Sequence, residues 1–247
     1  PRSLAGKLVS IADKLDTIVG IFAIGQGPTG SADPYALRRS AIGILTMIVD
    51  GGVRLDIDGA IASALEGYAP AVPGMNADEV GGAVKAFFDG RLSVMLRDRG
   101  LAYDVIDAVM AVASADPADT LHRAVALAGF RASEAGADLA IAFKRAANLA
   151  DTSAGAAPDV ALMGAEERAL DEALDRAYRS VGTLMGVERD YEGALAALAE
   201  LRGPVDAFFD TVLVMDPDEG LKRNRLALLN RLVGLFDGFC DFGKLAG

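Results

Sequence analysis

The sequence is short of cysteine, tryptophan and positive charge. Cys240 is the single cysteine among 247 residues, so one chain can build neither a disulfide framework nor a multi-cysteine zinc site. A lone thiol fits a reducing compartment, and we expect the protein to be cytoplasmic. Acidic residues outnumber basic ones and give a formal net charge of −11, which excludes a general attraction to nucleic acid. Any contact with RNA must therefore be local.

The sequence also lacks an apolar run long enough to cross a membrane. The longest stretches without charge are residues 18–32 and 40–49, and the first is interrupted by glycine and proline. Neither reaches the ~18 apolar residues of a spanning helix. The sequence begins Pro1-Arg-Ser-Leu, without an apolar signal core or an initiator methionine. We expect a protein with no membrane partner that is a piece of a longer chain.

What the sequence does contain is helical periodicity. Apolar residues make up 52% of the chain, enough for a large core. They recur at three-and-four spacing over residues 4–22, and alternating strand patterns are scarce. The sequence predicts an all-α fold with two helical domains, residues 1–113 and 114–247. The expected helical segments after the first are 34–48, 57–67, 78–97, 103–113, 121–130, 139–149, 166–185, 191–201, 204–214 and 218–242.

Loops separate these helices at positions rich in glycine, proline and small residues. The loop 25–31 is one example, and Asp33 after it is placed to cap the next helix, with Pro34 in the first turn. Residues 152–158 are small and turn-prone, which fits either an ordered loop or a flexible insertion.

Three segments of the sequence form a distinctive combination. The first is Ala12-Asp-Lys-Leu-Asp-Thr-Ile-Val-Gly-Ile-Phe-Ala-Ile-Gly-Gln26, continued by Pro28-Thr-Gly-Ser-Ala-Asp-Pro-Tyr-Ala-Leu-Arg-Arg39. The second is Lys144-Arg-Ala-Ala-Asn148, and the third runs from Val205-Asp-Ala-Phe-Phe-Asp-Thr-Val-Leu-Val-Met215 to Leu221-Lys-Arg-Asn-Arg-Leu226. These segments resemble the glycyl-tRNA synthetase β subunit, and the likeness spans both ends of the chain in order.

The resemblance implies the C-terminal part of a β subunit of a tetrameric aminoacyl-tRNA synthetase. In that family a separate α subunit makes glycyl-adenylate with ATP and magnesium, and the β subunit binds glycine tRNA. Residues 1–113 would be the later part of an HD-like domain, and residues 114–247 an anticodon-binding helical bundle. This chain would then be part of an enzyme without a catalytic residue or cofactor of its own.

Eight residues are candidate tRNA ligands. Lys144, Arg145 and Asn148 form a basic and polar group on one helix, of the kind that contacts phosphates and splayed bases. Arg38 and Arg39 lie in the first turns of a helix whose N-terminus could attract a phosphate. The alternative is that these side chains are simply solvated. The remaining candidates, Arg223, Asn224 and Arg231, belong to the last helix.

Projection of the last helix separates a structural arginine from these outward-facing candidates. Arg225 falls near the centre of its apolar face, where an unpaired charge costs several kcal/mol. The sequence predicts that Asp206 or Asp210 pairs with Arg225. Asn230 is expected to face outward with Arg223, Asn224 and Arg231.

Two other functions compete with tRNA binding. Asp13, in an Ala-Asp-Lys setting, resembles a metal ligand of HD-type hydrolases, but the only histidine, His122, lies far along the chain. The sequence favours no metal site and assigns Asp13 and Asp16 to hydrogen bonds or to pairs with Lys14 or Arg38. We expect His122 to be structural and Cys240 to be a core thiol. A pure scaffold that never touches RNA is the second rival.

Overall fold

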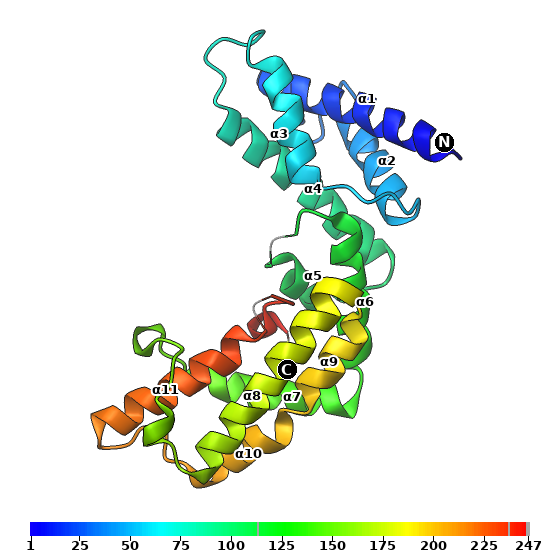
Figure 1. Ribbon diagram of the computed structural model, residues 1–247. Helices are drawn as coiled ribbons and strands as arrows, with labels where there is room; N and C mark the ends of the chain where they lie inside the picture. Colours follow the sequence, from blue (N-terminus) through cyan, green and yellow to red (C-terminus); the bar gives the residue numbers. More distant parts are fainter. Residues whose placement is uncertain (113, 237, 246–247) are drawn as a thin grey trace. The chain divides into compact units, whose positions relative to one another are not determined.

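The computed structural model is built of helices (Figure 1). It describes residues 1–112, 114–236 and 238–245. Within these ranges the chain forms eleven α-helices and no strand, with one isolated bridge between Thr29 and Ala32. The predicted all-α fold is confirmed. No helix among the described residues combines the length and the apolar character that crossing a membrane requires.

The chain divides into two compact units. Unit 1 comprises Pro1–Leu101 and Ala113–Leu121, and unit 2 comprises Ala102–Val112 and His122–Gly247. Near the expected boundary at 113 and 114, the segment before it belongs to unit 2 and the segment after it belongs to unit 1, so the chain passes between the units more than once. Residue 113 itself lies outside the described residues. The HD-like and anticodon-binding identities of the two domains stay predictions.

Unit 1 is built on α1 (Leu4–Ala23), which packs against α2 (Leu37–Val49), α3 (Ile57–Tyr68) and α4 (Ala77–Asp98). Ile18 and Val19 of α1 are fully buried, as the periodicity predicts. Each large aliphatic side chain buried in this way contributes about 1.5–3 kcal/mol. Asp16 of α1 accepts a hydrogen bond from the Tyr68 hydroxyl (3.0 Å), so its partner is neither Lys14 nor Arg38.

The helix α2 begins later than the sequence predicts. Asp33 does cap it, because its carboxylate accepts hydrogen bonds from the backbone N–H groups of Leu37 (2.8 Å) and Arg38 (3.0 Å). Ala36, however, adopts a left-handed conformation with φ of 55°, which separates Pro34 from the helix. Pro34 therefore lies outside the first turn, where it was expected.

Unit 2 contains the remaining helices: α5 (Tyr103–Met110), α6 (Pro117–Arg131), α7 (Glu134–Leu149), α8 (Ala165–Thr183), α9 (Tyr191–Ala199), α10 (Arg202–Thr211) and α11 (Glu219–Gly234). The first residues of α6 belong to unit 1. A π-helical turn, Leu184–Glu188, follows α8. Short 3-10 turns lie at η1 (Thr152–Ala154), η2 (Val160–Leu162) and η4 (Phe242–Lys244).

The last helix ends at Gly234, well before the predicted end at residue 242. Beyond it, the backbone N–H of Asp241 donates to the carbonyl of Ala108 (2.9 Å) instead of to a residue one turn earlier, so the helix does not continue to residue 242. Phe236, Phe239 and Phe242 are all buried, and the rings of Phe236 and Phe242 lie 4.6 Å apart between centroids, in an edge-to-face arrangement. Cys240 lies in the same segment and is 1% exposed, which confirms a core thiol.

Candidate nucleic-acid interface

Three of the predicted ligands lie together on the exposed side of α7. Ser133 caps this helix, accepting a hydrogen bond from the N–H of Gly136 (3.1 Å). The helix buries Leu139, Ala142, Phe143 and Ala146, and this leaves Lys144, Arg145 and Asn148 exposed. We call these three residues the α7 cluster. Its Lys144 and Asn148 are four residues apart and therefore lie on the same side of the helix.

The cations of the α7 cluster are available to a ligand. Among the described residues, Lys144 and Arg145 form no ion pair, whereas several other basic residues of unit 2 do. The Arg145 guanidinium lies 4.4 Å from the centroid of the Phe209 ring, a cation–π contact that holds it while leaving its hydrogen-bond donors free. An oriented arginine of this kind loses less entropy when it binds a phosphate.

On α11 only Arg223 has the exposure that the sequence predicted. It is exposed and has no ion pair within the part of the chain that the structure describes. It borders a polar hollow of about 620 Å³ between the start of α11 and η1. Asp151 and Glu219 also line this hollow, so its charge is mixed.

Asn224 does not face outward, contrary to the prediction. It is 7% exposed, and its side-chain amide pairs with the backbone of Asp159, accepting from the N–H (2.6 Å) and donating to the carbonyl (3.1 Å). The side-chain amide of Asn230 pairs in the same way with the backbone of Asp151, and it also donates a hydrogen bond to the carbonyl of Gly155 (2.6 Å). The segment 151–159 is therefore an ordered loop held against α11.

Arg231 is also directed inward rather than outward. Its guanidinium donates hydrogen bonds to Asp171 and Asp175 of α8 and lies 5.6 Å from the centroid of the Tyr178 ring. Burial lowers its pKa, but the two carboxylates more than offset this and raise it. Arg231 thus joins α11 to α8, and binding to RNA would require both carboxylates to release it.

Arg225 lies at the predicted place but has other partners. Its side chain is 13% exposed, and it donates to Glu167 of α8 (2.9 Å), Asp216 (2.6 Å) and the carbonyl of Leu213 (2.9 Å). The predicted pairing with Asp206 or Asp210 is wrong, because α8 packs against α11 and brings Glu167 to it. Burial lowers the pKa of Arg225, and the bonds to Asp216 and Glu167 raise it by more.

The two arginines of α2 differ from each other. Arg38 is half-buried and donates a hydrogen bond to the carbonyl of Gly30 (2.6 Å), which fastens the loop before the helix. Arg39 is exposed. The backbone N–H groups at this helix start are occupied by Asp33, which leaves little for a phosphate.

A groove adjoins the α7 cluster. It encloses about 530 Å³ between α6, α7 and η4, and its lining includes Lys144 and Asn148. Sequence reasoning missed it, because its floor combines Phe143 with Phe242, which are distant in the sequence. The positions of the phenylalanines along the sequence do not indicate a groove.

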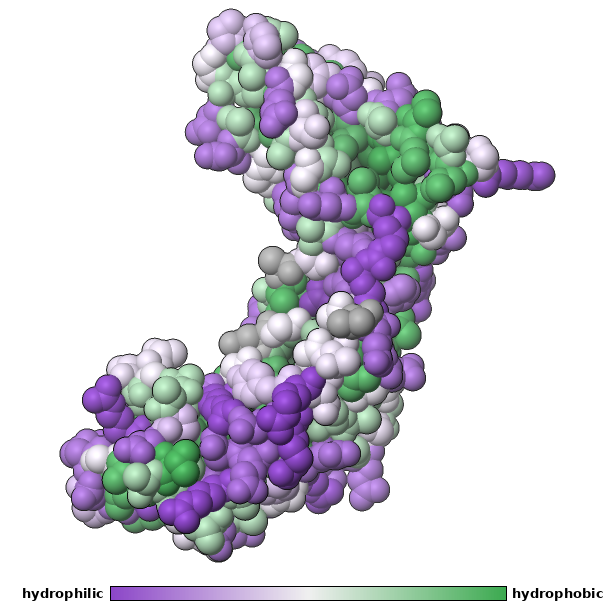
Figure 2. Space-filling model, in the orientation of Figure 1, coloured by the Kyte–Doolittle hydropathy of each residue, from purple (hydrophilic) through white to green (hydrophobic). Residues whose placement is uncertain are grey.

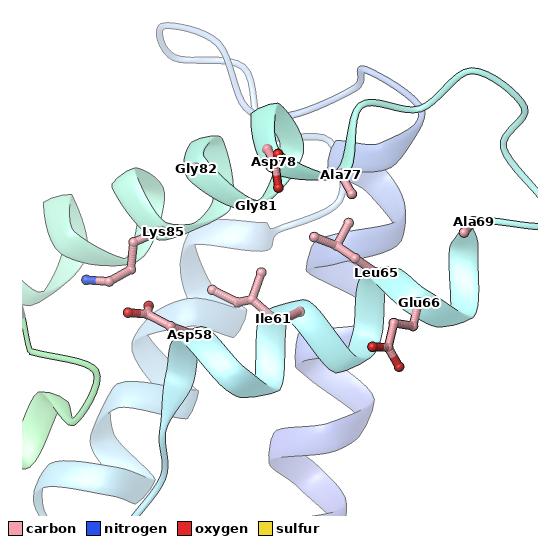
Figure 3. A pocket seen from close by; sticks show the side chains of 11 residues that line it. Asp58, Ile61, Leu65, Glu66, Ala69, Ala77, Asp78, Gly81, Gly82 and Lys85 are labelled. Atoms are coloured by element: carbon pink, nitrogen blue, oxygen red, sulfur yellow. The ribbon is translucent and has the colours of Figure 1, made fainter.

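A second groove, in unit 1, has the opposite electrostatic character. It lies between α3 and α4, encloses about 530 Å³, and is bordered by Asp58, Glu66, Asp78 and Lys85. Figure 3 shows Asp58 and Lys85 projecting toward each other from the two helices. Burial raises the pKa of Asp58, and the nearby Lys85 opposes this rise. With three carboxylates to one ammonium, this groove does not suit a phosphate.

The outer surface of unit 1 also includes an apolar patch. Figure 2 shows hydrophobic residues gathered over α1 and α2, on a surface that is otherwise largely polar. The α1 side chains Leu4 and Val9 are 62% and 70% exposed, and Leu8 and Ile42 are also exposed. Such a patch is a common feature of surfaces that meet another protein segment.

The residues of the rival enzyme hypothesis are not assembled into a site. Asp13 and His122 are both exposed. Within residues 1–112, 114–236 and 238–245, no group of three or more histidine, cysteine, aspartate or glutamate side chains could hold a metal ion. Burial raises the pKa of the Cys240 thiol far above its ordinary value, which makes it a poor nucleophile.

Comparison with known proteins assigns the chain to a class of enzyme subunits. Residues 1–111 match the family model described as glycyl-tRNA synthetase beta subunit, which places the chain among the aminoacyl-tRNA synthetases. The chain is 43% identical to the glycine–tRNA ligase beta subunit of Rhodospirillum centenum, over 100% of this chain and 35% of that protein. The corresponding proteins of Desulforamulus reducens and Acinetobacter baumannii are each 42% identical, over 99% and 100% of this chain.

The chain therefore belongs to the glycyl-tRNA synthetase beta subunit family. It spans about a third of the length of the curated relatives it matches, 35% in the first two and 36% in the third.

Proposed function

We propose that this chain is a tRNA-binding region of a glycine–tRNA ligase beta subunit, and that it holds glycine tRNA in position for ATP-dependent glycylation. The observation that carries the proposal is the α7 cluster, whose two cations are exposed and unpaired among the described residues. The names of the relatives, glycine–tRNA ligase beta subunits, supply the substrate.

The charge of the chain makes this cluster informative. With a net charge of −11, the protein repels RNA at long range, and several arginines of unit 2, such as Arg202, Arg225 and Arg231, are paired with carboxylates. The α7 cluster instead presents two adjacent exposed cations without an ion pair among the described residues, and a cation–π contact orients one of them. Phosphate contacts of this kind fix the register and orientation of a nucleic acid.

In this role the chain contributes positioning and no chemical step. Holding a large substrate in a productive orientation lowers the entropic part of the barrier at a remote site. The proposal includes a separate alpha subunit in a heterotetramer, which uses ATP and magnesium, and a cytoplasmic setting. The exposed apolar patch over α1 and α2 favours a second role in unit 1, that of a docking surface within such an assembly.

The test is a titration of the assembled ligase with glycine tRNA at low and moderate salt. We expect the double variant Lys144→Ala/Arg145→Ala to bind at least about tenfold more weakly, since one hydrogen bond to a charged group contributes about 1.5–3 kcal/mol and about 1.4 kcal/mol corresponds to a factor of ten. The slope of log affinity against log salt should fall by about 1 for each phosphate that the variant no longer binds. Arg176→Ala is the matched control, because Arg176 is exposed on α8 and has no ion pair among the described residues.

Two further variants separate RNA ligands from structural residues. Arg223→Ala should weaken binding only if the start of α11 also meets the RNA. Arg231→Ala should lower thermal stability, because it leaves Asp171 and Asp175 facing each other. If the double variant on α7 binds glycine tRNA as the control does, with an unchanged salt slope, the proposal fails. The chain would then be a scaffold that does not contact RNA.

A further inference from the structure

The groove beside the α7 cluster has the size and the apolar floor of a small-ligand pocket. Its volume of about 530 Å³ falls within the roughly 300–1,000 Å³ typical of such pockets. Leu127, Phe143 and Phe242 form the floor and are at most 7% exposed. The two aromatic rings lie 5.4 Å apart between centroids and are tilted by 46° to each other, so both contribute to an aromatic floor.

One wall of the groove consists of residues with little or no side chain. Gly136, Ala137 and Ala140 of α7 line it, and they leave room that larger residues would fill. Gly136 is fixed by packing, because a Cβ there would lie 2.1 Å from the carbonyl oxygen of Phe130. Ala137 is exposed. A flat group can therefore enter beside α7 without displacing a side chain.

The rim of the groove carries positive charge and hydrogen-bonding groups. Lys144 and Asn148 line it, and so does Arg131, whose charge is offset by an ion pair with Asp104 (2.7 Å). None of the described residues that line the groove is acidic. In a chain with a net charge of −11, a groove without a carboxylate is complementary to an anion. The aromatic floor suits the face of a base, the Asn148 amide suits the edge of that base, and the Lys144 ammonium suits its phosphate.

We propose that this groove receives a single unstacked base of the bound tRNA, with its phosphate at Lys144 and its edge at Asn148. The inference rests on the proposed function, since it names the part of the RNA that this site holds. Binding of bases on aromatic side chains contributes about 1–3 kcal/mol per base and tolerates many sequences. Asn148 supplies the hydrogen bonds that can prefer one base over another.

The test fills the groove without removing a buried side chain. Ala137→Phe, in the assembled ligase, should weaken binding of glycine tRNA about 5- to 100-fold, with the salt slope unchanged because every phosphate-binding side chain remains in place. Ala135→Phe is the matched control, because Ala135 is exposed on the same helix and does not line the groove. Ala147→Phe, at another exposed position of the lining, repeats the test in case one variant misfolds.

A second arm identifies the base directly. Glycine tRNAs with one abasic nucleotide at each unpaired position are titrated against the wild type and the filled variant. One abasic position should weaken binding to the wild type by a similar factor and should cause no further loss in Ala137→Phe. Such non-additivity shows that the base and the groove share one interaction.

The outcomes distinguish this inference from the function on which it rests. If both filled variants bind as Ala135→Phe does, while Lys144→Ala still weakens binding, the groove holds no base and the proposed function stands. If neither the filled variants nor the charge variants change binding, both proposals are overturned. Additive losses at every abasic position would also refute the groove, because the base would then bind elsewhere.

Discussion

Replacement of Arg225 by methionine tests the packing that holds unit 2 together. The guanidinium makes three hydrogen bonds, of which the bond to Glu167 is the most protected, since the Glu167 side chain is 4% exposed. In Arg225→Met, the Glu167 carboxylate would lose its cation and, among the described residues, would keep the bond from the N–H of Gly164 (2.6 Å). A buried carboxylate that loses its cation costs about 3–5 kcal/mol.

The bond to Asp216 contributes less to this loss. The Asp216 side chain is 23% exposed, so water can replace the guanidinium there. We therefore expect Arg225→Met to destabilise unit 2 by about 3–5 kcal/mol, mostly through Glu167. The double variant Arg225→Met/Glu167→Gln should recover much of this loss, because a neutral amide costs less to bury than a carboxylate and still accepts the capping bond.

Urea unfolding, combined with hydrogen exchange of the α8 and α11 amides, measures this effect in the unit concerned. Lys222→Met is the matched control on the same helix. Its partner Glu219 is 82% exposed, and such surface pairs contribute about 0–1 kcal/mol. If Arg225→Met kept wild-type stability but lost tRNA binding, the structural role of Arg225 would be wrong.

Three further predictions concern the loop, the thiol and the pH dependence. Asn230→Ala should release residues 151–155 from α11, and this should appear as faster hydrogen exchange and proteolysis of that segment while α11 stays intact. Unchanged rates would show that Asn230 does not hold the loop. Cys240 should resist alkylation at pH 8 until the protein unfolds, because burial raises its pKa; rapid native labelling would contradict this. The backbone N–H of Asp218, and after it Arg225, lower the pKa of Asp216 in the folded protein. The ionised Asp216 should therefore stabilise the fold above its unfolded pKa near 3.8, and this contribution should be lost as the pH falls through the lower folded pKa. Acid unfolding of Asp216→Asn should lack this component, and an unchanged acid limb would count against it.

The helices of this protein could be predicted because they depend on local sequence. The stripe of Leu15, Ile18 and Val19 defines the buried side of α1 without reference to any other segment. The cap by Asp33 is also local. The start of α2 was placed too early because the left-handed conformation of Ala36 leaves no mark in the pattern of apolar residues.

The errors in the candidate site arose where tertiary contacts decide the outcome. Helical projection correctly placed Arg225 on the core side, but its partner Glu167 is remote in sequence and could not be identified by spacing. Projection also put Asn224 on the polar side of α11, where the loop 151–159 then covers it. The α7 cluster is exposed in the structure, although the Phe209 ring of the later helix α10 contacts Arg145.

The most direct test of tRNA binding by the α7 cluster is photo-crosslinking of the assembled ligase to glycine tRNA. A photoreactive residue is placed at position 141, which is exposed and lies one turn from Lys144 on α7, or, as a control, at position 176 on α8. Our account predicts a crosslink from position 141 to glycine tRNA that is stronger than that from position 176 and is lost when unlabelled glycine tRNA competes. Crosslinking from position 141 that is absent, or no stronger than from position 176, would contradict the claim that α7 holds the tRNA.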